Sequence, residues 1–406
     1  MFNITLRERE VLRGLAGLVA EIAARDEEDV KRRLWYAHND LEPTRPLVFC
    51  EPENGWNEII TGDSMQCEGE LARNWEFRLR QEVFRGRHMD DDRVLEAYFD
   101  VPHVYEESDW GMRERRIGGE GGGAFTWEAP LKDYADLRLL RYPEITVDYK
   151  RTDDLVSLAR EVFDGILTVR LKTGWYWSLG LTWQFVYLRG LEELLFDFYD
   201  YPDEVHKFMA VLRDGHLAKL DFLEEGGLLS PNNDGSYVGS GGFGWTRQLP
   251  EPAGKVGTKD MWGFAESQET VNVSPEMFAE FILPYQLPIL GRFGLNCYGC
   301  CEALNARWEY IKNIPNLRRV SVAPWADVRD MAEKLQGDYV FSYKPNPAYI
   351  AVRNIDEDFI RSSLRDTVGM TKGCRLEIVL KDTNTIGGNP DNVINWCRIA
   401  KEAVEG

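Results

Sequence analysis

Apolar residues follow two patterns that alternate along most of the chain. Residues 5–25 open with the capping-box pattern Thr5-Leu-Arg-Glu8 and then carry apolar residues at helical spacing, which predicts an amphipathic helix. Further helical patterns lie at 71–84, 154–163 and 191–225. Short, nearly continuous apolar runs predict buried strands at 47–50, 94–101, 166–171, 293–295, 319–322, 339–343 and 376–380. One more strand is expected to end near Asn232.

Alternation of this kind is typical of a parallel sheet covered by helices, and eight such units close naturally into a barrel. The sequence therefore predicts an α/β protein of the TIM (β/α)8 barrel class, with the barrel over 45–406 and an N-terminal helical extension over 1–44. Residues 105–150 differ, because they are rich in Gly, Trp and Glu around Gly118-Gly-Glu-Gly-Gly-Gly123. They predict an irregular insertion after strand two.

Polar residues follow the predicted strands at the ends where a TIM barrel places its ligands. These residues are Glu51, Asp100, Asn232, Cys300, Lys344 and Asp382. Aromatic residues also gather in the predicted loops, namely Trp56, Trp110, Trp175, Tyr176, Trp177 and Trp262. They could line a pocket for a flat or methylated organic ligand, and packing in the core is an equal alternative for each of them.

The stretch Gly294-Leu-Asn-Cys-Tyr-Gly-Cys-Cys-Glu302 holds three of the seven cysteines. Adjacent thiols such as those of Cys300 and Cys301 are too close along the chain for an ordinary disulfide, but both could become thiolate ligands of a soft metal. A single cysteine is commonly a small buried hydrophobe, so that alternative stays open. Gly299 could supply a sharp turn that brings both side chains to one side.

Composition excludes several classes of function. A formal net charge of −20 argues against a protein that tracks nucleic-acid phosphates. No apolar run approaches the length that spans a bilayer, so no membrane association is expected. The first residues lack the layout of a secretory signal, and the odd number of cysteines shows no disulfide framework, so we expect a cytoplasmic protein.

Several motifs follow one another in an order that resembles a known superfamily. Arg45-Pro46 precedes the first strand, Tyr201-Pro-Asp-Glu-Val205 and Ser274-Pro-Glu-Met-Phe278 lie in the middle, and Asn389-Pro-Asp-Asn-Val393 comes near the end. Together they resemble the uroporphyrinogen decarboxylase (URO-D) superfamily over roughly residues 45 to 405. The resemblance implies a TIM barrel with one of two chemistries.

True decarboxylases of that superfamily use an Arg in the first loop and a His after strand eight. This chain has Glu51 and Glu53 in the first loop and Lys381-Asp-Thr-Asn384, without a His, in the last. Those decarboxylases also use an Asp after strand two, and Asp100 is the one residue here that resembles their pattern. The corrinoid-linked methyltransferases instead hold zinc through a His-x-Cys after strand five. Tyr298-Gly-Cys300 lies at that place, so the chain looks closer to the methyltransferase branch, with Cys300 carried over and the His replaced.

The resemblance implies a methyltransferase that moves a methyl group between a small methylated organic compound and a corrinoid carried by a separate protein. The expected zinc ligands are Cys300, Cys301 and Glu266, with Glu269, Glu302 or Asp382 as other oxygen donors. The expected catalytic residues are Tyr298, Asp382 and Lys344. The expected substrate-binding residues are Glu51, Trp56, Asp100, Asn232 and Trp262. A homodimer is a further expectation.

Two other readings stay open. A metal-free decarboxylase acting on a small or tetrapyrrole acid would use Lys344 and Asp100. A ligand-binding barrel that has lost its reaction would explain why the chain departs from both family patterns.

Overall fold

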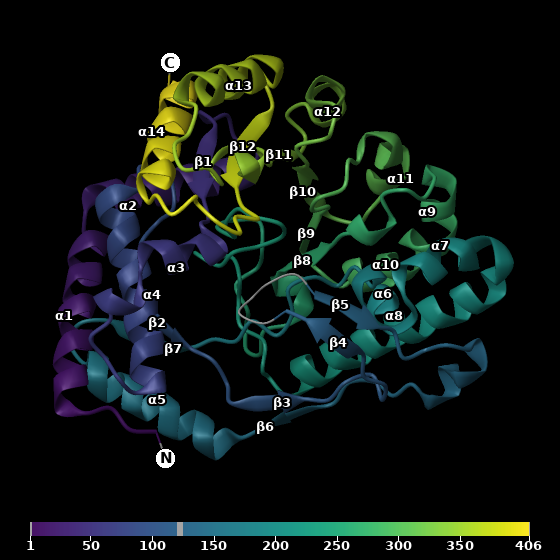
Figure 1. Cartoon of the computed structure of the whole chain (residues 1–406), viewed down its shortest axis with the longest axis horizontal. Helices are drawn as coiled ribbons and strands as arrows, with labels where there is room; N and C mark the ends of the chain where they lie inside the picture. The colour runs from purple at the N-terminus through teal and green to yellow at the C-terminus, as the bar shows by residue number, and fades with distance from the viewer. Residues whose placement is uncertain (1, 120–124, 406) are drawn as a thin grey trace.

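The computed structural model describes residues 2–119 and 125–405. Its parallel strands are β1 (Leu47–Cys50), β2 (Tyr98–Val101), β7 (Thr168–Leu171), β8 (Trp262–Ala265), β9 (Leu295–Tyr298), β10 (Leu317–Val322), β11 (Val340–Tyr343) and β12 (Arg375–Leu380). They form a six-stranded sheet in the order β1-β12-β11-β10-β9-β8 and a separate two-stranded sheet of β2 and β7 (Figure 1). The predicted parallel α/β architecture is confirmed.

The expected closure into one eight-stranded ring is not found. Within residues 2–119 and 125–405, β1 does not pair with β2, and β7 does not pair with β8. The fold is therefore TIM-like but opens at two seams, one at each edge of the six-stranded sheet.

Two aspartates cover the β1 edge of this sheet. The backbone N–H of Asp92 donates to the carbonyl of Val48 at 2.7 Å, and the Asp92 carboxylate accepts from the N–H of Val48 at 2.8 Å. The Asp91 carboxylate accepts from the N–H of Cys50 at 3.2 Å. These carboxylates satisfy the edge groups that a neighbouring strand would otherwise bond, so the sheet ends here.

At the other edge, an asparagine completes β8. The Asn232 amide accepts from the N–H of Trp262 at 2.9 Å and donates to the carbonyl of the same residue at 3.0 Å. The N–H of Leu179 donates to the carbonyl of Phe264 at 2.9 Å. The prediction of a strand ending near Asn232 was therefore wrong: the fourth parallel strand is β8, and Asn232 binds its edge because a side-chain amide offers a donor and an acceptor, as a peptide group does.

Helices cover the outer side of the strands. They are α1 (Leu6–Ala23), α2 (Asp26–Asn39), α3 (Trp56–Ile59), α4 (Glu70–His88), α5 (Tyr149–Phe163), α6 (Thr182–Arg189), α7 (Leu191–Asp200), α8 (Pro202–Glu225), α9 (Pro275–Phe281), α10 (Leu283–Leu290), α11 (Trp308–Ile311), α12 (Val328–Leu335), α13 (Glu357–Met370) and α14 (Asp391–Glu405). The predicted capping box of α1 is present at Thr5 and Glu8. α1 packs against α4 and α5, so this first helix joins the helical layer beside β2 and β7 (Figure 1). Among the described residues, no helix combines the length and apolar character needed to cross a membrane.

The predicted insertion is present between β2 and α5 and holds two short antiparallel pairs. β3 (Tyr105–Glu107) pairs with β6 (Ile145–Val147), and β4 (Arg115–Gly118) pairs with β5 (Phe125–Glu128). Residues 120–123 of the predicted glycine-rich centre lie outside the described residues.

Residues 236–245 run along the inner face of the six-stranded sheet. Three of their glycines have positive φ values and leave no room for a side chain. A Cβ at Gly239 would lie 2.6 Å from Cys297 Cβ on β9, and one at Gly241 would lie 2.6 Å from Val379 Cγ1 on β12. A Cβ at Gly242 would lie 2.7 Å from a carboxylate oxygen of Glu377. We call residues 236–245 the interior segment, and it fills space that side-chain layers fill in an ordinary TIM barrel.

A buried ion pair stands beside the interior segment. Arg319 Nε on β10 lies 3.0 Å from Glu377 Oε1 on β12, and His38 Nε2 at the end of α2 lies 3.2 Å from Glu377 Oε2. Burial opposes ionisation of Glu377, but the Arg319 guanidinium prevails and lowers the pKa of Glu377 to about 2. This pair ties α2, β10 and β12 together.

Candidate functional site

Two adjacent thiols lie together where β9 ends. Gly299 has a φ of +91°, the left-handed conformation that glycine adopts without strain. This turn places Cys300 Sγ 3.6 Å from Cys301 Sγ, so both side chains lie on one side of the chain. The predicted role of Gly299 is confirmed.

Lys381 and Asp382, directly after β12, complete a cluster with the two thiols. Lys381 Nζ lies 3.7 Å from Cys300 Sγ and 2.6 Å from Asp382 Oδ1. Cys301 Sγ lies 3.5 Å from Asp382 Oδ2. β9 and β12 are separated by two strands and would lie about 14 Å apart in a flat sheet. The contact therefore crosses the curved sheet, and we call Cys300, Cys301, Lys381 and Asp382 the thiol cluster.

The surroundings shift the pKa values of the two thiols in opposite directions. The hydrogen bond with Cys301 lowers the pKa of Cys300, and the Lys381 ammonium acts in the same direction, although burial opposes it. The same hydrogen bond, together with burial, raises the pKa of Cys301. Burial disfavours the ammonium of Lys381, but Cys300 and Asp382 raise its pKa. The cluster thus favours a thiolate at Cys300, a thiol at Cys301 and an ammonium at Lys381.

Other expected strand-end residues stand near this cluster. Glu51 follows β1, where it accepts from Arg85 at 2.6 Å and from the indole of Trp56 at 2.8 Å. Lys344 follows β11, is buried, and donates to Ser342 Oγ at 2.5 Å. Burial lowers the pKa of Lys344 to about 8. Asp382 has a positive φ of +59°, a backbone conformation that non-glycine residues adopt at a cost and that is enriched at functional sites.

The interior segment supplies two residues to this mouth that the sequence analysis did not single out. Burial raises the pKa of the Tyr237 phenol well above its usual value, and the negative charges of Glu51, Asp382 and Cys300 act in the same direction. Ser240 is buried, and its hydroxyl lies close enough to Cys300 to help lower the pKa of that thiol. A glycine-rich sequence predicts a loop but does not reveal that the loop enters a barrel.

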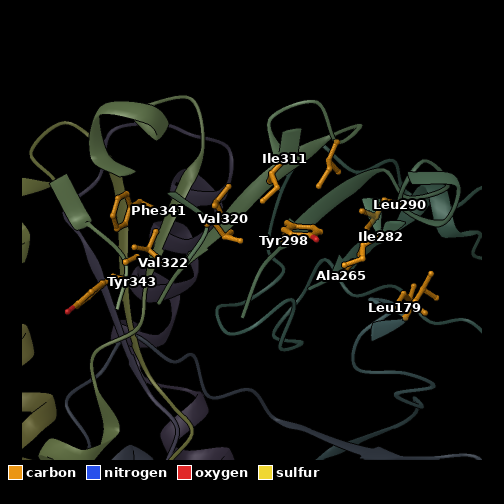
Figure 2. Close-up of a cluster of buried hydrophobic side chains, with 14 of the residues drawn as sticks. Leu179, Ala265, Ile282, Leu290, Tyr298, Ile311, Val320, Val322, Phe341 and Tyr343 are labelled. Carbon is orange, nitrogen blue, oxygen red and sulfur yellow. The ribbon is translucent and has the colours of Figure 1, made fainter. Parts of the chain in front are cut away.

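The structure places Tyr298 away from the thiol cluster. It is fully buried, faces the helical layer with its neighbours on the outer side of the sheet, and donates to Gln286 Oε1 at 2.8 Å (Figure 2). The expected strand at 293–295 lies at β9 instead, so Tyr298 is a strand residue and not a loop residue. Successive strand residues face opposite sides, which accounts for its outward direction.

Four of the expected substrate-binding residues also have other surroundings. Trp56 and Trp262 are buried, and the Trp262 indole donates to the carbonyl of Gly244 at 2.8 Å. Asp100 pairs with Arg170 at 2.6 Å in the two-stranded sheet. Asn232 binds the β8 edge, which leaves Glu51, with the Trp56 indole hydrogen-bonded to it, near the thiols.

The predicted zinc ligands do not assemble. The Glu266 carboxylate accepts from the Ser178 hydroxyl at 2.9 Å and from the N–H of Gln268 at 3.0 Å. Across residues 2–119 and 125–405, no three His, Cys, Asp or Glu side chains form a group that could hold a metal ion. The positive charge between Cys300 and Asp382 is the ammonium of Lys381. The described residues therefore do not fit a zinc ion bound by Glu266, Cys300 and Cys301.

A cavity of about 460 Å³ lies beside the seam between β7 and β8. Its lining includes Trp110, Tyr176 and Trp177 from the aromatic residues singled out in the sequence, together with Trp183. The other lining residues are Glu107, Pro143, Ser178, Gln184, Gly215, His216, Lys219, Glu266 and Gln268. The prediction of an aromatic pocket is confirmed in part, since Trp56, Trp175 and Trp262 are buried in the core.

Comparison with known proteins adds little about identity. No protein-family model matches the chain. No curated protein matches it either. Among solved structures it is similar to one described as a methyltransferase from Methanosarcina mazei, with a TM-score of 0.49 and 10% identity over 92% of this chain and 98% of that one. The URO-D resemblance stays a prediction, and the function proposed below rests on the geometry of the site.

Proposed function

We propose that this chain is a methyltransferase that moves a methyl group between a small organic compound and a corrinoid on a separate protein, acting at the thiol cluster. The observation that carries the proposal is the contact between Cys300 after β9 and Lys381 after β12. It gathers two cysteines, a lysine and an aspartate at the strand ends where TIM-like folds place their chemistry.

The cluster suits removal of a methyl group from oxygen, nitrogen or sulfur. Such a heteroatom leaves more readily when it gains a proton as its bond to carbon breaks. Lys381 is the proton donor in this proposal, Asp382 orients it, and the Cys300 thiolate keeps it protonated between turnovers. The corrinoid would supply the cobalt that accepts the methyl group. No step is assigned to zinc, because Glu266 does not join Cys300 and Cys301 and the Lys381 ammonium stands between Cys300 and Asp382.

The decarboxylase alternative requires Lys344 and Asp100 to act on one substrate. Lys344 follows β11 in the six-stranded sheet, whereas Asp100 is paired with Arg170 in the other sheet. No observation brings these two groups to one ligand, so we do not favour this alternative.

The test incubates the protein with a reduced corrinoid protein and a panel of methoxylated aromatics, methylamines and methyl thiols while the cobalt spectrum is followed. We expect Cys300→Ser and Lys381→Met to lower the rate of cobalt methylation by about a hundredfold or more, the range of a lost general acid. We expect Cys301→Ser to lower it less. Cys374→Ser, a half-buried cysteine outside the cluster, is the matched control.

Three outcomes would count against the proposal. Full activity of Cys300→Ser and Lys381→Met would remove the thiol cluster from the reaction. Loss of activity in Lys344→Ala, with a Cys300→Ser, Cys301→Ser double variant fully active, would favour the decarboxylase. Saturable ligand binding without methyl transfer to any corrinoid acceptor would favour a binding barrel.

Metal analysis of untagged protein should find no stoichiometric zinc.

A further inference from the structure

The aromatic cavity beside the β7–β8 seam is built from parts of the chain that lie far apart in sequence. Tyr176 and Trp177 follow β7, Glu266 follows β8, Trp110 belongs to the insertion, and Trp183 belongs to α6. Its volume of about 460 Å³ falls in the range of small-molecule sites. Four aromatic rings from three segments thus surround one space of ligand size.

One lining residue, Glu266, belongs to a group of three acidic side chains, of which Glu302 is also within electrostatic reach of Arg307. Glu266, Glu269 and Glu302 are close enough for Glu269 and Glu302 to add to burial in raising the pKa of Glu266. Their carboxylates accept hydrogen bonds from Ser178, Thr182 and backbone N–H groups. None of the three forms an ion pair with a lysine, arginine or histidine in the described part of the chain. Buried like charges without a partner are costly, and a bound cation would offset that cost.

The lysine in the lining does not supply this charge. Lys219 Nζ donates to both oxygens of Glu107, at 2.7 and 2.8 Å, so its charge is already neutralised. The two side chains close the cavity as a neutral pair.

A histidine provides a second, independent indication of a ligand. His216 is 7% exposed, lines the cavity, and finds no hydrogen-bond partner for either ring nitrogen among residues 2–119 and 125–405. Burial lowers the pKa of His216 to about 3, so the ring stays neutral and one nitrogen remains an acceptor. Buried polar atoms are nearly always satisfied, so a ligand with a polar hydrogen is expected beside it.

We propose that this cavity binds a small organic cation with a methylated ammonium group, surrounded by Trp110, Trp177 and Trp183 and opposed by the carboxylate of Glu266. Aromatic faces attract ammonium groups through their negative quadrupole, and methyl groups add apolar contact with the rings. The polar remainder of the ligand, such as a hydroxyl group, hydrogen-bonds to His216.

One carboxylate connects this cavity to the thiol cluster. Glu302 accepts from the N–H of Ser267, the residue after Glu266, at 2.8 Å, and from the N–H of Cys300 at 2.9 Å. The bound cation is the methyl-bearing compound only if the proposed function holds. Binding itself does not depend on that function.

The test is calorimetric titration of the full chain with choline and with its uncharged isostere, in which a tert-butyl group replaces the trimethylammonium. The two probes differ in charge and hardly in shape. We expect choline to bind at least about tenfold more tightly, because its charge is attracted by the aromatic faces and by Glu266. Physiological ionic strength keeps unspecific attraction to the acidic surface screened.

Variants then assign the contacts. Trp177→Leu and Glu266→Gln should each weaken choline binding by about tenfold. Trp177 is half exposed and Glu266→Gln nearly preserves shape, so both variants should fold, which circular dichroism checks. Tyr199→Leu, at an exposed residue of α7, is the matched control and should bind choline normally. Equal binding of the two probes, unaltered affinity of Glu266→Gln, or no binding of choline overturns the proposal.

The design also separates this inference from the proposed function. Choline should bind Cys300→Ser as tightly as it binds the unaltered chain, because the thiol does not line the cavity. Intact binding without methyl transfer would refute the methyltransferase and leave the cation site. Methyl transfer from an uncharged compound without choline binding would refute the cation site alone.

Discussion

Replacing Lys381 by methionine removes the ammonium that lies 3.7 Å from Cys300 Sγ and keeps most of the side-chain volume. The Cys300 thiolate then loses its nearest positive charge, while the hydrogen bond with Cys301 remains. We expect the pKa of Cys300 to rise.

The magnitude follows from the distance. Two unit charges about 4 Å apart attract by about 4 kcal/mol at an effective dielectric constant of about 20, and by about 1 kcal/mol in bulk water. One pKa unit corresponds to about 1.4 kcal/mol. Because Lys381 is buried and Cys301 is only half-buried, the site lies between these limits, and we expect a rise of about 1 to 3 units.

The assay is the pH dependence of iodoacetamide alkylation, with Cys300 and Cys301 distinguished by tandem mass spectrometry. Lys381→Arg, which keeps the charge, should leave the pKa of Cys300 nearly unchanged. Lys312→Met, which removes a surface lysine paired with Glu309, should have no effect. An unaltered alkylation profile in Lys381→Met would refute the reasoning, because it would mean that Lys381 does not stabilise the thiolate.

The other predictions concern the same loop and the barrel interior. Cys301→Ala should also raise the pKa of Cys300, since it removes the hydrogen bond that lowers it, and the alkylation assay would detect this. Gly299→Ala should lower the free energy of unfolding by about 1 to 3 kcal/mol, because the residue has a positive φ and its Cβ would lie 2.6 Å from a neighbouring leucine methyl. The control is Gly369→Ala, which has open space around its Cβ and should not lower the melting temperature. Glu377→Gln should cost about 3 to 5 kcal/mol by leaving a buried guanidinium unpaired. The folded-state pKa of Glu377 is about 2, against a usual 4.5. The carboxylate therefore stabilises the fold above pH 4.5 and loses that effect as the pH falls toward 2. In acid-unfolding experiments, the stability of Glu377→Gln should lack this dependence on pH.

Local sequence patterns predicted the features that depend on neighbouring residues. The apolar run at 47–50 is β1, the capping box at Thr5 starts α1, and Gly299 takes the backbone angles that only glycine adopts easily. The parallel α/β class followed from the same alternation. Each of these features is determined by a few consecutive residues, whose spacing is visible in the sequence.

The register of the strands and the closure of the barrel could not be predicted from local sequence patterns. The apolar run at 293–295 did not reveal that the strand continues to Tyr298, and a change of one position reverses the direction of every side chain. Carboxylates at Asp91 and Asp92 and the amide of Asn232 occupy the sheet edges. Nothing in their local sequence distinguishes them from loop residues that face solvent.

The site itself depends on contacts between distant segments. Cys300 was singled out from its neighbours in the sequence, but its charge partner is Lys381, 81 positions further along the chain. The carboxylate of Glu266, expected beside the thiols, faces a cavity whose other walls come from the insertion and from α6 and α8. Sequence by itself determined which residue types follow the strands. Only the tertiary structure decided which of them meet, because curvature of the sheet and the path of the loops bring together side chains whose separation along the chain carries no information about distance.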